Sequence, residues 1–109
     1  MKLSTKISVC ILVKNAQDTI KECLESLQGF DEIILLDNQS SDDTLKIANE
    51  FKSKFGNLRI YSSEFIGFGP LKNLAISYAS NDWIFSIDSD EVLEFSTLKE
   101  LENLKLNPN

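Results

Sequence analysis

Short apolar runs alternate along this 109-residue chain with stretches in which apolar residues recur at helical spacing. The runs, each expected to form a buried strand, are residues 7–13, 33–36, 58–61 and 83–87. A continuous apolar run is typical of a strand that is covered on both faces. Strands that alternate with helices predict a mostly parallel sheet with helices on both faces, which is a three-layer α/β/α, Rossmann-like arrangement.

The helical stretches carry their own start and stop signals. The first is expected from about Asp18 to Gly29, and the second after the Ser40–Asp43 cluster of hydroxyls and acids, which is suited to capping a helix. A third is expected to open at Pro70, and Thr97 to Glu100 have the form of a capping box for a terminal helix. Their apolar positions are Ile20, Cys23, Leu24 and Leu27, then Leu45, Ala48 and Phe51, then Leu71, Leu74, Ala75 and Tyr78, and finally Leu98, Leu101 and Leu104.

Composition excludes several classes of function. A length of 109 residues with 42% hydrophobic residues predicts one domain over residues 1–109 with one core. The net charge of −6 argues against binding to nucleic acid or to an anionic membrane surface. The chain contains no histidine, which excludes catalytic triads and histidine-containing zinc sites.

The two cysteines and the apolar runs indicate a compartment. Cys10 and Cys23 fall on apolar stripes, so we expect buried free thiols in a reducing cytosol. The first six residues are too short and too polar for a signal peptide, and no apolar run approaches the ~18 residues of a membrane-spanning helix. We therefore expect a cytoplasmic protein, with peripheral attachment at the inner membrane as an additional option.

Acids follow two of the apolar runs directly. Asp37 follows the run 33–36, and Asp88 and Asp90 follow the run 83–87. On an extended backbone, residues i and i+2 point to the same side, so Asp88 and Asp90 are expected to share a divalent cation and, through it, a diphosphate. Ligands of open parallel sheets bind outside the carboxyl ends of the strands, where these acids would lie.

Four segments together resemble family 2 of the inverting glycosyltransferases. They are Ile7-Ser8-Val9-Cys10-Ile11-Leu12-Val13-Lys14-Asn15, Leu36-Asp37-Asn38-Gln39-Ser40-Ser41-Asp42-Asp43-Thr44, Pro70-Leu71-Lys72-Asn73-Leu74-Ala75 and Trp83-Ile84-Phe85-Ser86-Ile87-Asp88-Ser89-Asp90-Glu91. The resemblance runs from about residue 7 to residue 93 and covers the N-terminal, nucleotide-sugar-binding half of the GT-A fold. The segment around Lys72 and Asn73 is similar to the subgroup that modifies lipopolysaccharide cores and other surface glycans.

The resemblance implies a role for each strand end. It implies that Asp37 accepts a hydrogen bond from the uracil or guanine of a nucleotide sugar, and that Val13 and Asn15 line the pocket of the base. It also implies that Lys72 meets phosphate with its charge.

The acids after residue 87 resemble the D-x-D element of the family. By this resemblance Asp88 contributes to nucleotide binding, and Asp88 and Asp90 ligate Mg²⁺ or Mn²⁺ that bridges the diphosphate. Glu91 is expected to support the loop rather than to bind the metal. Phe65 and Phe68 are expected to pack in the core or within their loop.

The implied function is transfer of a sugar from a UDP- or GDP-sugar to a surface-glycan or lipid-linked acceptor. The general base of this family lies well beyond the D-x-D element, and only 19 residues follow Asp90. We therefore expect the acceptor half to be absent and the base to lie beyond residue 109. The chain alone would then bind donor without transferring sugar, and it would self-associate or pair with a separate C-terminal half.

Two other classes of function use similar acids. A haloacid dehalogenase-like phosphatase would use Asp88 as nucleophile and Asp90 as acid, but that motif normally follows the first strand of its domain. A receiver-like module that binds metal or nucleotide without catalysis would need its acidic pair after the first strand, where Lys14 and Asn15 stand.

Overall fold

The computed structural model describes residues 6–94, 97, 99 and 100, and it confirms the predicted alternation of strands and helices. The elements are β1 (Ile7–Val13), α1 (Ile20–Glu25), β2 (Glu32–Asp37), α2 (Thr44–Lys54), β3 (Leu58–Ser62), α3 (Phe68–Ser77) and β4 (Trp83–Asp88). The leucines of the predicted terminal helix, Leu98, Leu101 and Leu104, lie outside the described residues.

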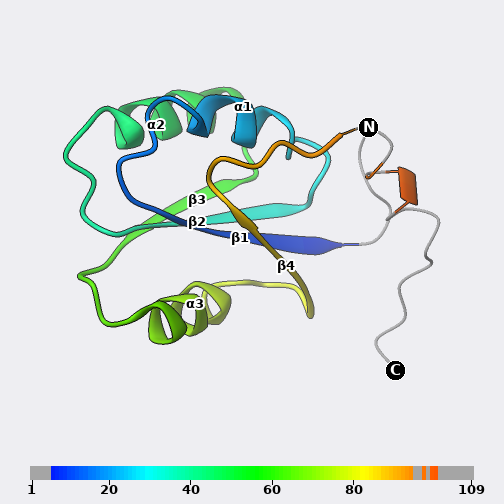
Figure 1. The fold of residues 1–109 in the computed structure, drawn as a ribbon. Coiled ribbons are helices and arrows are strands. Elements are labelled where there is room, and N and C mark those ends of the chain that lie inside the picture. Colours follow the sequence, from blue (N-terminus) through cyan, green and yellow to red (C-terminus); the bar gives the residue numbers. More distant parts are fainter. Residues whose placement is uncertain (1–5, 95–96, 98, 101–109) are drawn as a thin grey trace.

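The strands form one parallel sheet in the order β3-β2-β1-β4. Figure 1 shows α1 and α2 on one face of this sheet and α3 on the other. The reason is the hand of the crossovers, because a right-handed connection from β1 to β2 and on to β3 places its helices on one face. The step from β3 back across the sheet to β4 runs in the opposite direction and places α3 on the other face. The predicted three-layer architecture is confirmed.

The core has two parts, one on each side of β1. Val9 and Ile11 are fully buried beneath α1 and α2, whereas Cys10 is buried beneath α3, where the half-buried Leu12 also packs. Successive side chains of a strand point to opposite faces, so β1 must be apolar throughout. The continuous run at residues 7–13 is therefore explained by two-sided burial.

Two helix boundaries differ from the prediction. Helix α1 ends at Glu25 instead of reaching Gly29, and the hydroxyl of Ser26 donates to the carbonyl of Cys23 at 2.6 Å. A side-chain donor of this kind competes with continuation of the helix. Helix α3 begins at Phe68, two residues before Pro70, because Gly67 adopts a φ of +100° that starts the turn.

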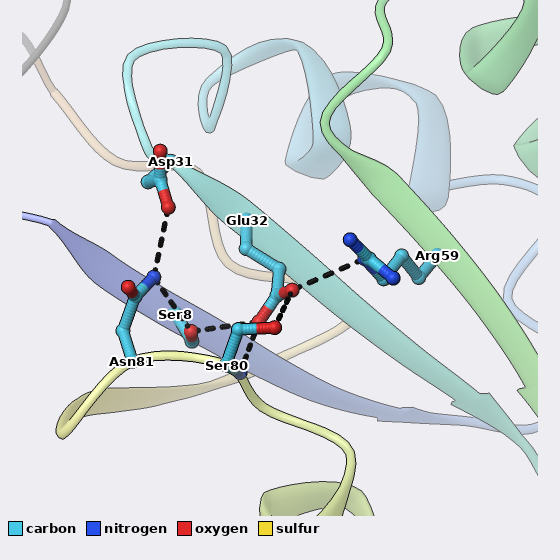
Figure 2. A network of polar contacts seen from close by, with 6 residues as sticks. All are labelled: Ser8, Asp31, Glu32, Arg59, Ser80 and Asn81. Atoms are coloured by element: carbon cyan, nitrogen blue, oxygen red, sulfur yellow. Dashed lines mark hydrogen bonds and ion pairs between the residues drawn. The ribbon is translucent and has the colours of Figure 1, made fainter.

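A buried carboxylate joins the strands at the amino edge of the sheet (Figure 2). Glu32 is 4% exposed and accepts hydrogen bonds from the hydroxyl of Ser8 at 2.8 Å and from the backbone N–H and the hydroxyl of Ser80 at 2.8 and 2.9 Å. It also pairs with Arg59 of β3, whose Nε lies 3.1 Å from Oε2. Burial alone would raise the pKa of Glu32, but these hydrogen bonds and the Arg59 charge lower it below its ordinary value of 4.5.

The same edge is closed by an amide. The Nδ2 group of Asn81 donates to the hydroxyl of Ser8 at 3.1 Å and to the carboxylate of Asp31 at 2.9 Å. Ser80 and Asn81 lie in the connection from α3 to β4. The network therefore fixes the start of β4 to β1 and β2.

We expect Glu32→Gln to destabilise the fold at pH 7 by roughly 2 kcal/mol, because the amide nitrogen of glutamine would face donors that now meet a carboxylate oxygen. The pKa of Glu32 is lowered in the folded state, so its contribution is present above pH 4.5 and is lost as the pH falls below that value. Urea denaturation of both proteins between pH 7 and pH 3 should show the difference in stability shrinking.

The exposed Glu50 of α2 provides the control, since Glu50→Gln removes the same charge without a buried partner. A Glu32→Gln protein that is as stable as the wild type at pH 7 would show that the network does not stabilise the sheet.

Candidate donor-binding edge

Three strand ends meet at the carboxyl edge of the sheet. Val13 at the end of β1 is in register with Asp37 at the end of β2, and Leu12 is in register with Asp88 at the end of β4. Asp37 and Asp88 therefore lie on the two strands that flank β1, which places them two strand spacings, or roughly 10 Å, from each other. The chain changes direction across the sheet between β1 and β4, and such a switch point is where open α/β sheets bind ligands.

Asp37 is a buried carboxylate that is only half satisfied. The side chain is 1% exposed, and its Oδ2 accepts a hydrogen bond from the backbone N–H of Ser40 at 3.1 Å. Its Oδ1 is buried and meets no donor among the described residues, and the same holds for Oδ1 of Asn38. Buried polar atoms are nearly always paired, so two adjacent unpaired acceptors at a strand end indicate a place for a donor group of a ligand.

The backbone around Asp37 is held in place. Asn38 donates its N–H to the carbonyl of Val13 at 2.8 Å, and Ser63 donates its N–H to the carbonyl of Asp37 at 2.9 Å. These bonds extend the strand ladders by one residue at the edge. Val13 itself is buried in the core, so it can face a ligand only through its backbone.

The loop after β1 and the loop after β2 are bonded to each other, and we call the bonds between residues 15–17 and 40–44 the inter-loop contacts. The backbone N–H of Asn15 donates to the hydroxyl of Ser40 at 2.8 Å, and that of Ala16 donates to the hydroxyl of Thr44 at 2.8 Å. In the other direction, the backbone N–H of Ser41 donates to Oδ1 of Asn15 at 2.7 Å. The expectation that Ser40 and Ser41 cap α2 was wrong, because their hydroxyls bond to Asn15 instead.

Asp42 joins the start of α2 to the loop after β1. It accepts bonds from the backbone N–H and the hydroxyl of Thr44 at 2.9 and 2.5 Å, and from the backbone N–H of Gln17 at 3.3 Å. The Thr44 hydroxyl contributes most to lowering the pKa of Asp42. Thr44, the first residue of α2, is fully buried and was not predicted as part of the site. The sequence pattern that could have indicated it is a hydroxyl residue two positions after an acid.

The end of β4 differs from the expected geometry. The strand stops at Asp88, and Ser89 and Asp90 form a turn that is closed by a bond from the N–H of Glu91 to the carbonyl of Asp88 at 3.0 Å. The expectation that Asp88 and Asp90 point to one side of an extended backbone was therefore wrong. Glu91 supports this turn as expected, since its carboxylate accepts the N–H of Asp88 at 2.8 Å.

A pocket of about 180 Å³ lies between α3 and the end of β4. Its lining combines apolar strand and helix residues with one cation and two acids. The lining residues are Cys10, Leu12, Lys72, Ala75, Ser86, Ile87, Asp88 and Glu91. The structure thus brings Lys72 and Asp88 together, although they are 16 residues apart in the sequence. Their opposite charges suit a ligand that carries both phosphate and cation.

The two thiols are free and buried, as predicted. Cys10 lies on the α3 side of the sheet and Cys23 on the α1 side. Burial, with a smaller contribution from Glu32, raises the pKa of Cys10 to about 11, and burial with Glu91 and Asp90 raises that of Cys23 to about 11. Neither thiol is suited to act as a nucleophile at neutral pH.

Two aromatic residues at the junction of the β3–α3 loop with α3 do not join the core. Phe65 and Phe68 are 55% and 75% exposed, and their rings contact each other edge to face at 5.2 Å between centroids. Of the two expected kinds of packing, the structure shows the local one, between Phe65 of the loop and Phe68 at the start of α3. Among the described residues, no helix is long and apolar enough to cross a membrane.

Comparison with known proteins agrees with the geometry. An uncharacterized glycosyltransferase of Rickettsia typhi is 35% identical over 98 residues, which make up 89% of this chain and 32% of that protein. A poly(ribitol-phosphate) beta-glucosyltransferase of Bacillus spizizenii is 36% identical over 96 residues, or 81% of this chain and 15% of that protein. The chain thus spans about a third, or less, of the length of these relatives.

A solved structure has the same fold. S. aureus TarS 1-349 in complex with UDP-GlcNAc superposes with a TM-score of 0.78 at 29% identity, over 91% of this chain and 30% of that chain. A sequence profile of glycosyl transferase family 2 matches residues 8–107. The parallel sheet with acids at its carboxyl edge is thus the Rossmann-like part of a GT-A fold, and the chain belongs to glycosyltransferase family 2.

Proposed function

We propose that this chain binds the nucleotide-sugar donor of a sugar-transfer reaction, and that the donor is a UDP-sugar. The observation that carries the proposal is the buried, unpaired Oδ1 of Asp37 beside the unpaired Oδ1 of Asn38 at the end of β2. Uracil offers one ring N–H, which a carboxylate at a strand end accepts with a charge-assisted bond. Because this oxygen is covered, the base must displace neighbouring atoms as it binds.

The spacing of the edge fits a nucleoside diphosphate. With the base at Asp37, the ribose would cross the end of β1 at Val13, and the diphosphate would reach the pocket that Lys72 and Asp88 line. The structural relatives TarS and a glucosyl-3-phosphoglycerate synthase of M. tuberculosis were both solved with UDP, which favours uracil over guanine as the base.

The acids at the end of β4 fit a divalent cation that a nucleotide completes. No three carboxylates or thiols within residues 6–94, 97, 99 and 100 gather into a metal cage. Mg²⁺ rarely needs one, because it is commonly held by one or two carboxylates together with substrate phosphates and water. Asp88 and Asp90, both exposed, would hold Mg²⁺ or Mn²⁺, and the bound ion would act as a Lewis acid on the leaving diphosphate.

The acceptor is inferred from the sequence around Lys72 and from one relative. The Lys72-Asn73 segment resembles the surface-glycan subgroup, and the Bacillus relative is a poly(ribitol-phosphate) beta-glucosyltransferase by name. We therefore propose a surface-glycan or lipid-linked acceptor. The general base is proposed to lie in sequence that follows residue 109 in the longer relatives.

The phosphatase alternative is not favoured. Asp88 is the last residue of β4, which is the last strand along the chain and lies at the edge of the described sheet, whereas that mechanism places the nucleophile after the first strand. The position after β1 carries Lys14 and Asn15, which also disfavours a receiver-like module.

We expect Asp37→Asn to weaken the binding of UDP at least about tenfold. Since Oδ2 of Asp37 accepts the N–H of Ser40, an asparagine must keep its oxygen there and would turn its NH₂ group toward the N–H of the base. Isothermal titration of UDP and GDP in the presence of Mn²⁺ measures the effect.

Asp82→Asn removes the same charge from an exposed residue at the amino end of β4 and should leave the affinity unchanged. Equal affinity of wild type and Asp37→Asn for both nucleotides would refute the assignment of Asp37. Tighter binding of GDP than of UDP would refute the choice of uracil.

We expect the double variant Asp88→Asn/Asp90→Asn to lose the gain in UDP affinity that Mn²⁺ provides, while metal-free affinity stays within about threefold. The matched control is Asp82→Asn/Glu50→Gln, which removes two exposed charges away from the pocket. A metal dependence that persists in the first variant would place the cation elsewhere.

A further inference from the structure

We propose that Asn15 is a positioning residue, whose side-chain oxygen holds the loop between β2 and α2 so that Asp37 and Asn38 face the nucleotide. This inference rests on the proposed function. It replaces the direct contact between Asn15 and the base that the family resemblance implied.

The side chain of Asn15 is already engaged by the protein. Its Oδ1 accepts the backbone N–H of Ser41 at 2.7 Å, and it lies 3.4 Å from both the backbone N–H of Asp42 and the hydroxyl of Ser41. A carbonyl oxygen has two lone pairs, so this set of donors uses its accepting capacity. Oδ1 of Asn15 therefore bonds to the loop between β2 and α2 and is not available to a base.

The backbone of Asn15 serves the same contact. Its φ is +51°, a left-handed conformation that asparagine tolerates better than most residues. In this conformation its N–H donates to the hydroxyl of Ser40 while its side chain meets Ser41. One residue therefore holds two successive residues of the opposite loop.

These bonds lead directly to the nucleotide edge. Ser40 donates its N–H to Oδ2 of Asp37, which leaves Oδ1 as the unpaired acceptor. Gln39, which lies between Asp37 and Ser40, is also left-handed, with a φ of +57°. The chain therefore turns sharply after Asp37, and the position of Asp37 depends on the contacts that fix Ser40 and Ser41. If Ser40 moves, the Asp37 carboxylate loses the partner that sets its orientation.

The remaining inter-loop contacts do not replace Asn15. The bonds from Ala16 to Thr44 and from Gln17 to Asp42 hold the base of the loop, next to the start of α2. The bonds of Asn15 are those that reach Ser40 and Ser41 at the tip. Removing the Asn15 side chain would keep the backbone bond to Ser40 but remove the bonds to Ser41 and Asp42. It should therefore loosen residues 39–43 and leave the fold intact.

The test compares Asn15→Gly with Asn15→Asp in the unliganded chain and with UDP and Mn²⁺. Glycine keeps the left-handed backbone but removes the acceptor, whereas aspartate keeps an acceptor oxygen and removes the NH₂ group. Gln17→Glu is the control for the added charge, since it keeps the oxygen that accepts the N–H of Asp43. Amide hydrogen exchange over residues 38–43 reports the loop, and titration with UDP reports binding.

We expect Asn15→Gly to speed exchange in residues 38–43 roughly tenfold and to weaken UDP binding by a similar factor, with exchange in β1 and β2 unchanged. Asn15→Asp should restore the slow exchange and bind UDP within about threefold of Gln17→Glu.

Three results would overturn the inference. One is weaker UDP binding by Asn15→Gly without faster amide exchange in residues 38–43. The second is loss of UDP binding by Asn15→Asp while amide exchange in residues 38–43 stays slow. Either result would show that Asn15 contacts the nucleotide directly. The third is faster exchange with unchanged UDP affinity, which would show a role in the loop alone. If the wild type binds no UDP, the proposed function fails, and exchange in the unliganded proteins still decides whether Asn15 holds the loop.

Discussion

The rest of the structure depends on the burial of β1 between two neighbouring strands and two layers of helix. Each fully buried aliphatic side chain such as Val9 or Ile11 contributes roughly 1.5–3 kcal/mol relative to an exposed one, and β1 provides such residues to the face under α1 and α2. To the opposite face it provides the buried Cys10 and the half-buried Leu12. A strand covered in this way leaves only its ends in contact with water. Polar side chains of β1 and its neighbours are thereby confined to the strand ends. At the carboxyl ends, β1 is also the point where the strand order reverses, since β2 and β3 lie on one side of it and β4 on the other.

Two buried carboxylates show how the two edges differ. At the amino edge, both oxygens of Glu32 have partners, and the network they form joins β1, β2 and β3 to the connection before β4. At the carboxyl edge, Asp37 is buried even more deeply and yet has one oxygen without a partner. A satisfied buried charge is compatible with a purely structural role, whereas an unsatisfied one costs stability that a ligand can restore. The contrast is a physical reason to assign stability to Glu32 and binding to Asp37.

The sequence predicted the fold well because strand burial leaves a local signal. The four apolar runs matched the four strands to within one residue at each end. Features that depend on contacts between distant segments were not predictable. The hydroxyl of Ser26, at the early end of α1, accepts the N–H of Leu93, which is 67 residues away. The partners of Ser40 and Ser41 lie 25 and 26 residues away, on Asn15. A pattern of hydroxyls and acids before a helix indicates a cap. Only the fold shows that these hydroxyls form hydrogen bonds with the loop after β1 instead.

The same limit explains the geometry at Asp88 and Asp90. The spacing of the acids was read as a strand pattern, but the carboxylate of Glu91 accepts the N–H of Asp88 and helps to turn the chain after β4. Cys23, whose thiol donates to the carbonyl of Asp88 at 3.8 Å, ties that turn to α1. The backbone of Asp88 is therefore fixed from both sides, while the carboxylates of Asp88 and Asp90 stay exposed. A fixed backbone with exposed acids is what a cation site needs when the remaining ligands come from the phosphates of its substrate.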